Sequence, residues 1–188
     1  MTPARLRLTL VLAGLALGAA VLLAWTQNWV AVTLVDGTVL SVAGQAAAPV
    51  LSTLGIAVLA LSAALTIAGP ILRRVLGVLQ ALIGAAVVSA ATTALVDPIA
   101  ASASTITAAT AVAGHDSVTA LVASAAASVW PWFAAVAGVL LLAVGIAVLI
   151  TARRWPRASR KYDAERTADT SNAGAWDALS EGDDPTSR

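Results

Sequence analysis

The sequence predicts an all-α membrane protein with four transmembrane helices, both termini in the cytoplasm and a disordered C-terminal tail. The first observation is composition: of 188 residues, 59% are hydrophobic and 11% are charged, which is too little charge to cover a soluble globule. The second is that the apolar residues gather into four stretches without a charge. The third is that Lys and Arg lie on alternate sides of these stretches.

The four apolar stretches run from Leu8 to Trp25, Pro49 to Ala68, Val75 to Leu95 and Trp130 to Ile150. At about 1.5 Å per residue, each approaches or matches the roughly 30 Å thickness of the hydrocarbon layer. None contains Asp, Glu, Lys, Arg or His, each of which would cost roughly 2.5 to 3.5 kcal/mol at a helix centre. We therefore expect residues 1–152 to form a four-helix transmembrane domain and residues 153–188 to form a tail.

The basic residues predict the orientation in the membrane. Arg5 and Arg7 precede the first stretch, Arg73 and Arg74 separate the second from the third, and the other seven Lys and Arg residues follow the fourth. The loops 26–48 and 96–129 hold no Lys or Arg. Because basic residues are retained in the cytoplasm, we expect both termini inside and both of these loops outside.

Tryptophans mark the outer ends of two stretches, with Trp25 and Trp29 after the first and Trp130 and Trp132 at the start of the fourth. We interpret these four side chains as an interfacial belt, with a ligand-stacking cage as the alternative.

The connections differ in character. Gly69-Pro70 predicts the end of one helix and a tight turn into the next. Asp36-Gly37, between apolar residues, is compatible with a small β-hairpin in the first outer loop. For the second outer loop we expect short helices, one of them capped by Asp116 or Ser117 and running towards Trp130.

Small residues at helical spacing predict close helix contacts. The first stretch contains a GxxxG motif at Gly14 and Gly18, the second repeats Ala60, Ala64 and Ala68, and the third has Gly77, Ala81 and Ala85 on one face with Gly84 beside it. Such contacts fit one bundle or two copies, so a homo-oligomer stays open.

Gln80 is the strongest polar group within the stretches, accompanied by the hydroxyls of Ser62, Thr66, Ser89, Thr92 and Thr93. The simpler interpretation is that Gln80 hydrogen-bonds across the bundle and that the hydroxyls bond to their own helix carbonyls. The alternative is a solute path along them. His115 has too few possible ligands nearby for a metal site, and no catalytic motif is present, so we expect no enzyme activity, metal, cofactor or nucleic-acid partner.

The tail changes sign along its length. Residues 153–162 are basic and suit an anionic lipid surface or a topology anchor, whereas the last residues are acidic. Trp176 and Leu179 would share one face of a short helix that begins near Ser171 or Asn172. We interpret them, with the neighbouring residues, as a candidate docking motif for a cytosolic protein partner; its members are Trp176, Asp177, Leu179, Glu181, Gly182, Asp183, Asp184 and Pro185.

The four-stretch layout, Tyr162-Asp163, Trp176 to Leu179 and Gly182 to Thr186 together resemble the tryptophan-biosynthesis-associated membrane proteins, small four-span proteins encoded within or beside tryptophan operons. Asp183 departs from the family pattern, which usually has Glu there. The resemblance implies a tryptophan-pathway association and a plasma-membrane location, and no established activity.

Three functions remain as hypotheses. The first is a non-enzymatic accessory protein or scaffold whose tail docks a cytosolic partner. The second is a carrier or exporter of tryptophan, indole or a related aromatic solute that uses Gln80. The third is a structural or sensing component of the envelope.

Overall fold

The structure is a computed structural model that describes residues 3–152. The chain divides into two units, Met1–Trp155 and Pro156–Arg188, and all described residues belong to the first. The predicted tail, with its docking motif from Trp176 to Pro185, therefore lies outside the described residues. Within the described residues the elements are α1 (Pro3–Thr26), β1 (Asn28–Leu34), β2 (Val39–Ala43), α2 (Gly44–Ala47), α3 (Val50–Ala64), α4 (Pro70–Val96), α5 (Pro98–Thr110), α6 (His115–Leu121), β3 (Val122–Ala127) and α7 (Trp130–Thr151).

Within residues 3–152, three helices are long and apolar enough to cross a membrane: α1, of which Ala4–Thr26 qualifies, α4 and α7. These correspond to the first, third and fourth predicted stretches. The second stretch yields α3, which has 15 residues and ends at Ala64, short of the predicted end at Ala68. Pro70 opens α4 after Gly69, so the predicted break at Gly69-Pro70 is confirmed.

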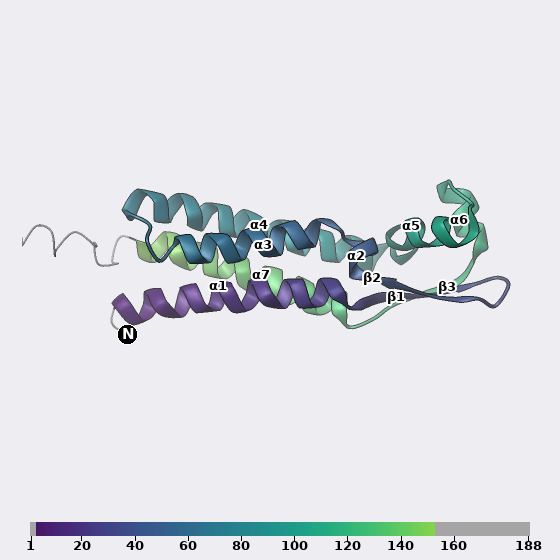
Figure 1. The fold of residues 1–188 in the computed structure, drawn as a ribbon, viewed down its shortest axis with the longest axis horizontal. Coiled ribbons are helices and arrows are strands. Elements are labelled where there is room, and N and C mark those ends of the chain that lie inside the picture. Colours follow the sequence, from purple (N-terminus) through teal and green to yellow (C-terminus); the bar gives the residue numbers. More distant parts are fainter. Residues whose placement is uncertain (1–2, 153–188) are drawn as a thin grey trace, which may run out of the picture. The chain divides into compact units, whose positions relative to one another are not determined.

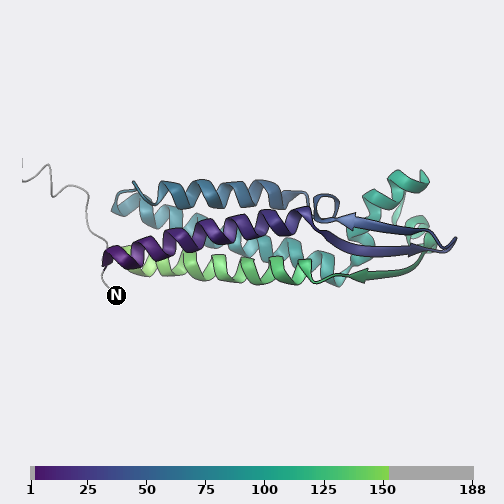
Figure 2. The ribbon, with the colours of Figure 1, turned by 60° about the horizontal axis from the view of Figure 1, so that its bottom comes forward.

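The helices α1, α3, α4 and α7 lie side by side, as both views show (Figures 1 and 2). Helix α3 runs antiparallel to α1, as shown by the contacts of Gly14 with Ser62 and of Gly55 with Leu22. Helix α7 likewise runs antiparallel to α4, as shown by the contacts of Gly77 with Val148 and of Gly84 with Leu142. Arg5, Arg7, Arg73 and Arg74 stand at one end of this bundle, which we call the arginine end. The strands and α2, α5 and α6 stand at the opposite end, which we call the sheet end (Figure 1).

A three-stranded antiparallel sheet, in the order β2-β1-β3, corrects the all-α prediction, although the described part of the chain is mostly helical. The hairpin at Asp36-Gly37 is confirmed. Gly37 has φ +86°, and the Thr38 N–H donates to Asp36 Oδ1 at 2.8 Å. The backbone N–H of Thr38, followed by its side chain, holds the pKa of the Asp36 carboxyl below its usual value. The register pairs Val32 with Leu40 on one side and with Ala125 on the other.

The second outer loop forms short helices, as expected, at α5 and α6, but then β3 instead of a helix towards Trp130. The predicted cap is wrong as well, because α6 begins after Gly114, with φ +102°, and no side chain caps it. The segment Val122–Ala127 has no alternation of apolar and polar residues, so its strand was not recognisable. It is ordered by pairing with the second edge of β1.

The apolar face of the sheet packs at the sheet end against α5 and α6. Val30, Val32 and Val42 lie in one buried cluster with Ile106 and Val118. Trp29 belongs to the same cluster with none of its surface exposed, and its Nε1–H donates to the Ala24 carbonyl at 2.7 Å. The prediction of an interfacial belt is therefore wrong for Trp29, which is a core residue.

Candidate functional site

The most extensive helix contact is the one between α4 and α7, where two pairs of glycines meet. A Cβ added to Gly84 would lie 2.5 Å from the Leu142 backbone nitrogen and 2.8 Å from the Gly138 carbonyl. One added to Gly145 would lie 2.5 Å from the Ala81 nitrogen and 2.8 Å from the Gly77 carbonyl. The two backbones touch, as the small residues of the third stretch predicted, and leave no room for a side chain between them.

Gln80, the one intramembrane residue singled out by the sequence, lies fully buried in the bundle. Its Nε2 and the Oγ of Ser62 are within 3.0 Å and 2.3 Å of the point that a Cβ on Gly14 would occupy. The interior polar site is therefore assembled from three helices: Gly14 of α1, Ser62 of α3 and Gln80 of α4. Neither the sequence spacing nor the small-residue motif had indicated that Gly14 and Gln80 lie together.

The hydrogen bonds expected of this site are only partly present. Thr66, Thr92 and Thr93 donate to carbonyls of their own helices, as predicted. The expectation is wrong for Gln80 and Ser62: both amide atoms of Gln80 and the Ser62 hydroxyl are buried without a hydrogen-bond partner in the part of the chain described. An atom of this kind that stayed unpaired would cost several kcal/mol in an apolar medium, so the chemistry of this site suits a polar partner such as water.

The arginine end is fixed by contacts between helices. The Arg7 guanidinium of α1 donates to the Thr66 carbonyl just beyond α3. Arg73 of α4 is 3% exposed, while its neighbour Arg74 is exposed. Arg73 is therefore part of the packed bundle, whereas a residue that served only as an orientation signal could remain exposed.

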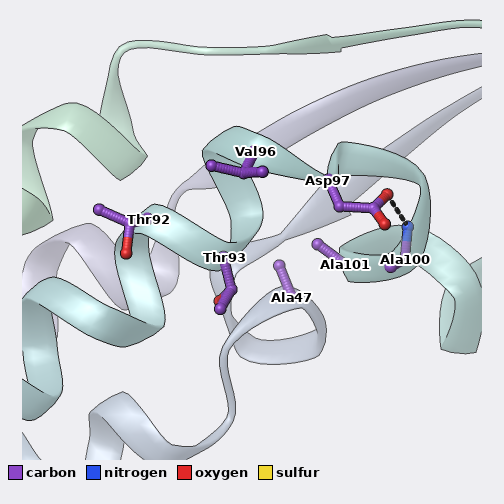
Figure 3. Close-up of a pocket in the computed structure, with 7 residues that line it drawn as sticks. All are labelled: Ala47, Thr92, Thr93, Val96, Asp97, Ala100 and Ala101. Atoms are coloured by element: carbon purple, nitrogen blue, oxygen red, sulfur yellow. Dashed lines mark hydrogen bonds between the residues drawn. The ribbon is translucent and has the colours of Figure 1, made fainter.

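A cavity of about 570 Å³ opens at the sheet end, where α4 ends and α5 begins. Figure 3 shows Thr92 and Thr93 on one side, Asp97 and Ala100 on the other, and Ala47 and Ala101 between them. Asp97 caps α5 by accepting the Ala100 N–H at 2.9 Å. The sequence had indicated Asp97-Pro98 only as a helix boundary. The cavity itself could not be predicted, because it also needs Ala47 of α2, which reaches this site only through a tertiary contact.

His115 is exposed, as expected. Within residues 3–152, no three His, Asp or Glu side chains lie close enough together to hold a metal ion.

A mostly helical bundle with three long apolar helices defines a helical membrane protein. The chain belongs to the family described as tryptophan-associated transmembrane proteins, whose model matches residues 11–186. This confirms the resemblance drawn from the sequence. Searches of curated proteins and of solved structures found no significant match.

Proposed function

We propose that this protein is a non-enzymatic scaffold in the plasma membrane whose tail recruits a cytosolic enzyme of tryptophan biosynthesis. Membership of a tryptophan-associated family supports the link to the pathway. The observation that favours a scaffold over a carrier is the backbone contact between α4 and α7. At Gly84 and Gly145 an added Cβ would meet backbone atoms at 2.5 Å, so this contact leaves no path for a solute between the two helices.

The proposed topology has four crossings with both termini in the cytoplasm. Helix α3 spans about 22 Å at 1.5 Å per residue, which is short for a full crossing. It nevertheless packs along α1 from Gly55, opposite Leu22, to Ser62, opposite Gly14. The turns after α3 continue to Thr66, which contacts Arg7, so α3 and its flanks return the chain from the sheet end to the arginine end. Four arginines at that end and none at the other support an inward-facing arginine end.

Single-cysteine labelling tests the topology, since the chain has no native Cys. In intact cells, an impermeant maleimide should label Asp36→Cys and Asp116→Cys but label Arg74→Cys only after the membrane is opened. Labelling of Arg74→Cys in intact cells would contradict the proposed orientation.

Docking of the partner is assigned to Trp176 and Leu179, which lie three residues apart and are surrounded by acidic residues. Aromatic anchors carry a large share of binding energy at interfaces, and the acidic neighbours suit a basic groove.

Fractionation of cells that make the full chain tests the recruitment. Tryptophan-pathway enzymes in the washed membrane fraction are quantified for wild type and for the double variant Trp176→Ala, Leu179→Ala. We expect one enzyme to be enriched with wild type and to fall at least about tenfold with the double variant, which corresponds to a loss of about 1.4 kcal/mol or more. Gln80→Leu serves as the matched control and should retain the enzyme. Equal enrichment in all three strains, or in none, would overturn the proposal.

A second candidate, a carrier of an aromatic solute, is favoured by the unpaired polar atoms of Gln80 and Ser62. This function predicts the opposite pattern. Efflux of labelled indole or tryptophan from cells should fall with Gln80→Leu and be indifferent to Trp176→Ala.

A further inference from the structure

We propose that the cavity between α4, α2 and α5 binds an organic cation, specifically a primary ammonium group attached to a compact apolar body. This inference is independent of the scaffold assignment, because it concerns the sheet end and uses none of the tail residues.

The size and walls of the cavity suit a small organic molecule. Its volume of about 570 Å³ falls within the roughly 300 to 1,000 Å³ typical of small-molecule sites. Most of its wall is made of methyl groups from Ala47, Val96, Ala100 and Ala101. The cavity can therefore hold a small apolar group such as one ring against its methyl-lined wall.

The polar groups of the cavity offer acceptors and no side-chain donor. The Thr92 hydroxyl already donates to the Val88 and Ser89 carbonyls at 2.9 Å, and the Thr93 hydroxyl donates to the Ala90 carbonyl at 2.8 Å. Each threonine oxygen can then only accept. An ammonium group, with three N–H donors and no acceptor, is the complement of such a lining.

Asp97 supplies the charge that selects a cation. One of its oxygens accepts the Ala100 N–H, which leaves the other carboxylate lone pairs available to a ligand. No Lys or Arg occurs in segments 26–48 and 96–129, so the outer segments bring no cation of their own to the site. The carboxylate of Asp97 therefore disfavours an anion in this cavity and favours a positive charge over a neutral donor.

The test uses the full chain in lipid nanodiscs of phosphatidylcholine and phosphatidylglycerol. Binding of 2-phenylethylamine is measured by calorimetry against empty nanodiscs, beside 2-phenylethanol and 3-phenylpropionate, which have a similar body with no charge and with a negative charge. We expect the amine to bind at least about tenfold more tightly than the alcohol and the carboxylate not to bind. Equal binding of amine and alcohol, or no binding of the amine, would overturn the proposal.

Variants assign the binding to this cavity. Asp97→Asn keeps a side-chain oxygen for the helix cap and removes only the charge, so the fold should survive while the affinity for the amine falls at least about tenfold. Asp36→Asn changes a carboxylate outside the cavity and should leave the affinity unchanged. If Asp97→Asn leaves the affinity for the amine unchanged, the amine does not bind at Asp97 and the proposal is wrong.

The headgroup of phosphatidylethanolamine also carries a primary ammonium group. A further binding experiment therefore distinguishes a soluble amine from this lipid as the ligand. If nanodiscs that contain this lipid weaken amine binding to wild type but not to Asp97→Asn, the site takes the lipid headgroup. If the affinity is the same in both lipid mixtures, the ligand is a soluble amine. Weakening of equal size in both proteins would show that the lipid acts elsewhere and that Asp97 is not its site.

Discussion

The two antiparallel helix pairs of the bundle use glycine in different ways. Where α4 meets α7, a Cβ added at Gly84 or Gly145 would strike backbone: the Leu142 nitrogen beside Gly84 and the Ala81 nitrogen beside Gly145, both at 2.5 Å. Where α1 meets α3, added Cβ atoms would strike side chains: the Ser62 hydroxyl beside Gly14 and Leu59 beside Gly18. A side chain can rotate away from a new methyl group, whereas a backbone can move only if its helix moves. The α4–α7 pair is therefore the rigid half of the bundle and the α1–α3 pair the adaptable half.

The largest effect is expected at the rigid pair. Gly84→Ala must push α4 and α7 apart and should lower the free energy of unfolding by about 3 kcal/mol, at the upper end of the usual cost of overpacking. Unfolding in mixed detergent micelles, followed by circular dichroism, measures the change. Gly69→Ala is the matched control, since an added Cβ there meets nothing within 4 Å. If the two variants lose the same stability, the rigid contact is not real.

A smaller effect is expected at Gly14, and it should be reversible by a second change. Gly14→Ala places a methyl group 2.3 Å from Ser62 Oγ and should cost about 1 to 2 kcal/mol. Ser62→Ala removes that oxygen and should restore most of the loss in the double variant. Gly18→Ala, whose Cβ would lie 3.0 Å from the flexible Leu59 side chain, should cost less than Gly14→Ala. Additive effects of Gly14→Ala and Ser62→Ala would show that the two residues do not touch.

Gln80 of α4, which faces Gly14 and Ser62 of the α1–α3 pair, tests whether the polar site between these three helices contains an unpaired polar group. Replacing an unsatisfied buried amide by an apolar group of similar shape is neutral or stabilising, so Gln80→Leu should raise the free energy of unfolding by about 1 kcal/mol. Thr93→Val is the comparison, because its hydroxyl is already bonded to the Ala90 carbonyl. A loss of stability in Gln80→Leu would mean that the amide has a partner, such as a bound water or a second copy of the chain.

The sequence predicted the parts of the fold that depend on local pattern. The three long helices follow from long charge-free stretches, the α4 start follows from Gly69-Pro70, and the hairpin follows from Asp36-Gly37. The sequence did not predict the features of the fold that depend on tertiary contacts. Trp29 was assigned to the lipid interface because its burial within strand β1 depends on contacts that its own sequence position does not show. Strand β3 was missed because its Ala and Ser residues favour no element.

The candidate sites show the same division. Gln80 was recognisable as a polar residue in an apolar stretch, but its neighbours Gly14 and Ser62 come from two other helices. Spacing within one helix cannot indicate which faces meet across a bundle. The cavity at Asp97 was missed for the same reason, since Ala47 lies far from Asp97 in the sequence and reaches it only in the folded chain.

The smallest expected effect lies outside the bundle, at the tip of the hairpin. Gly37 has φ +86° with nothing within 4 Å of an added Cβ, so Gly37→Ala introduces backbone strain and no clash. The cost should be about 1 kcal/mol, and Gly37→Asn, which tolerates this conformation better, should lose less. Because β1 also pairs with β3, the sheet should persist, and hydrogen exchange should rise only at Asp36 to Val39. Faster exchange along the whole of β1 would show instead that the hairpin turn holds the sheet together and that β3 contributes little.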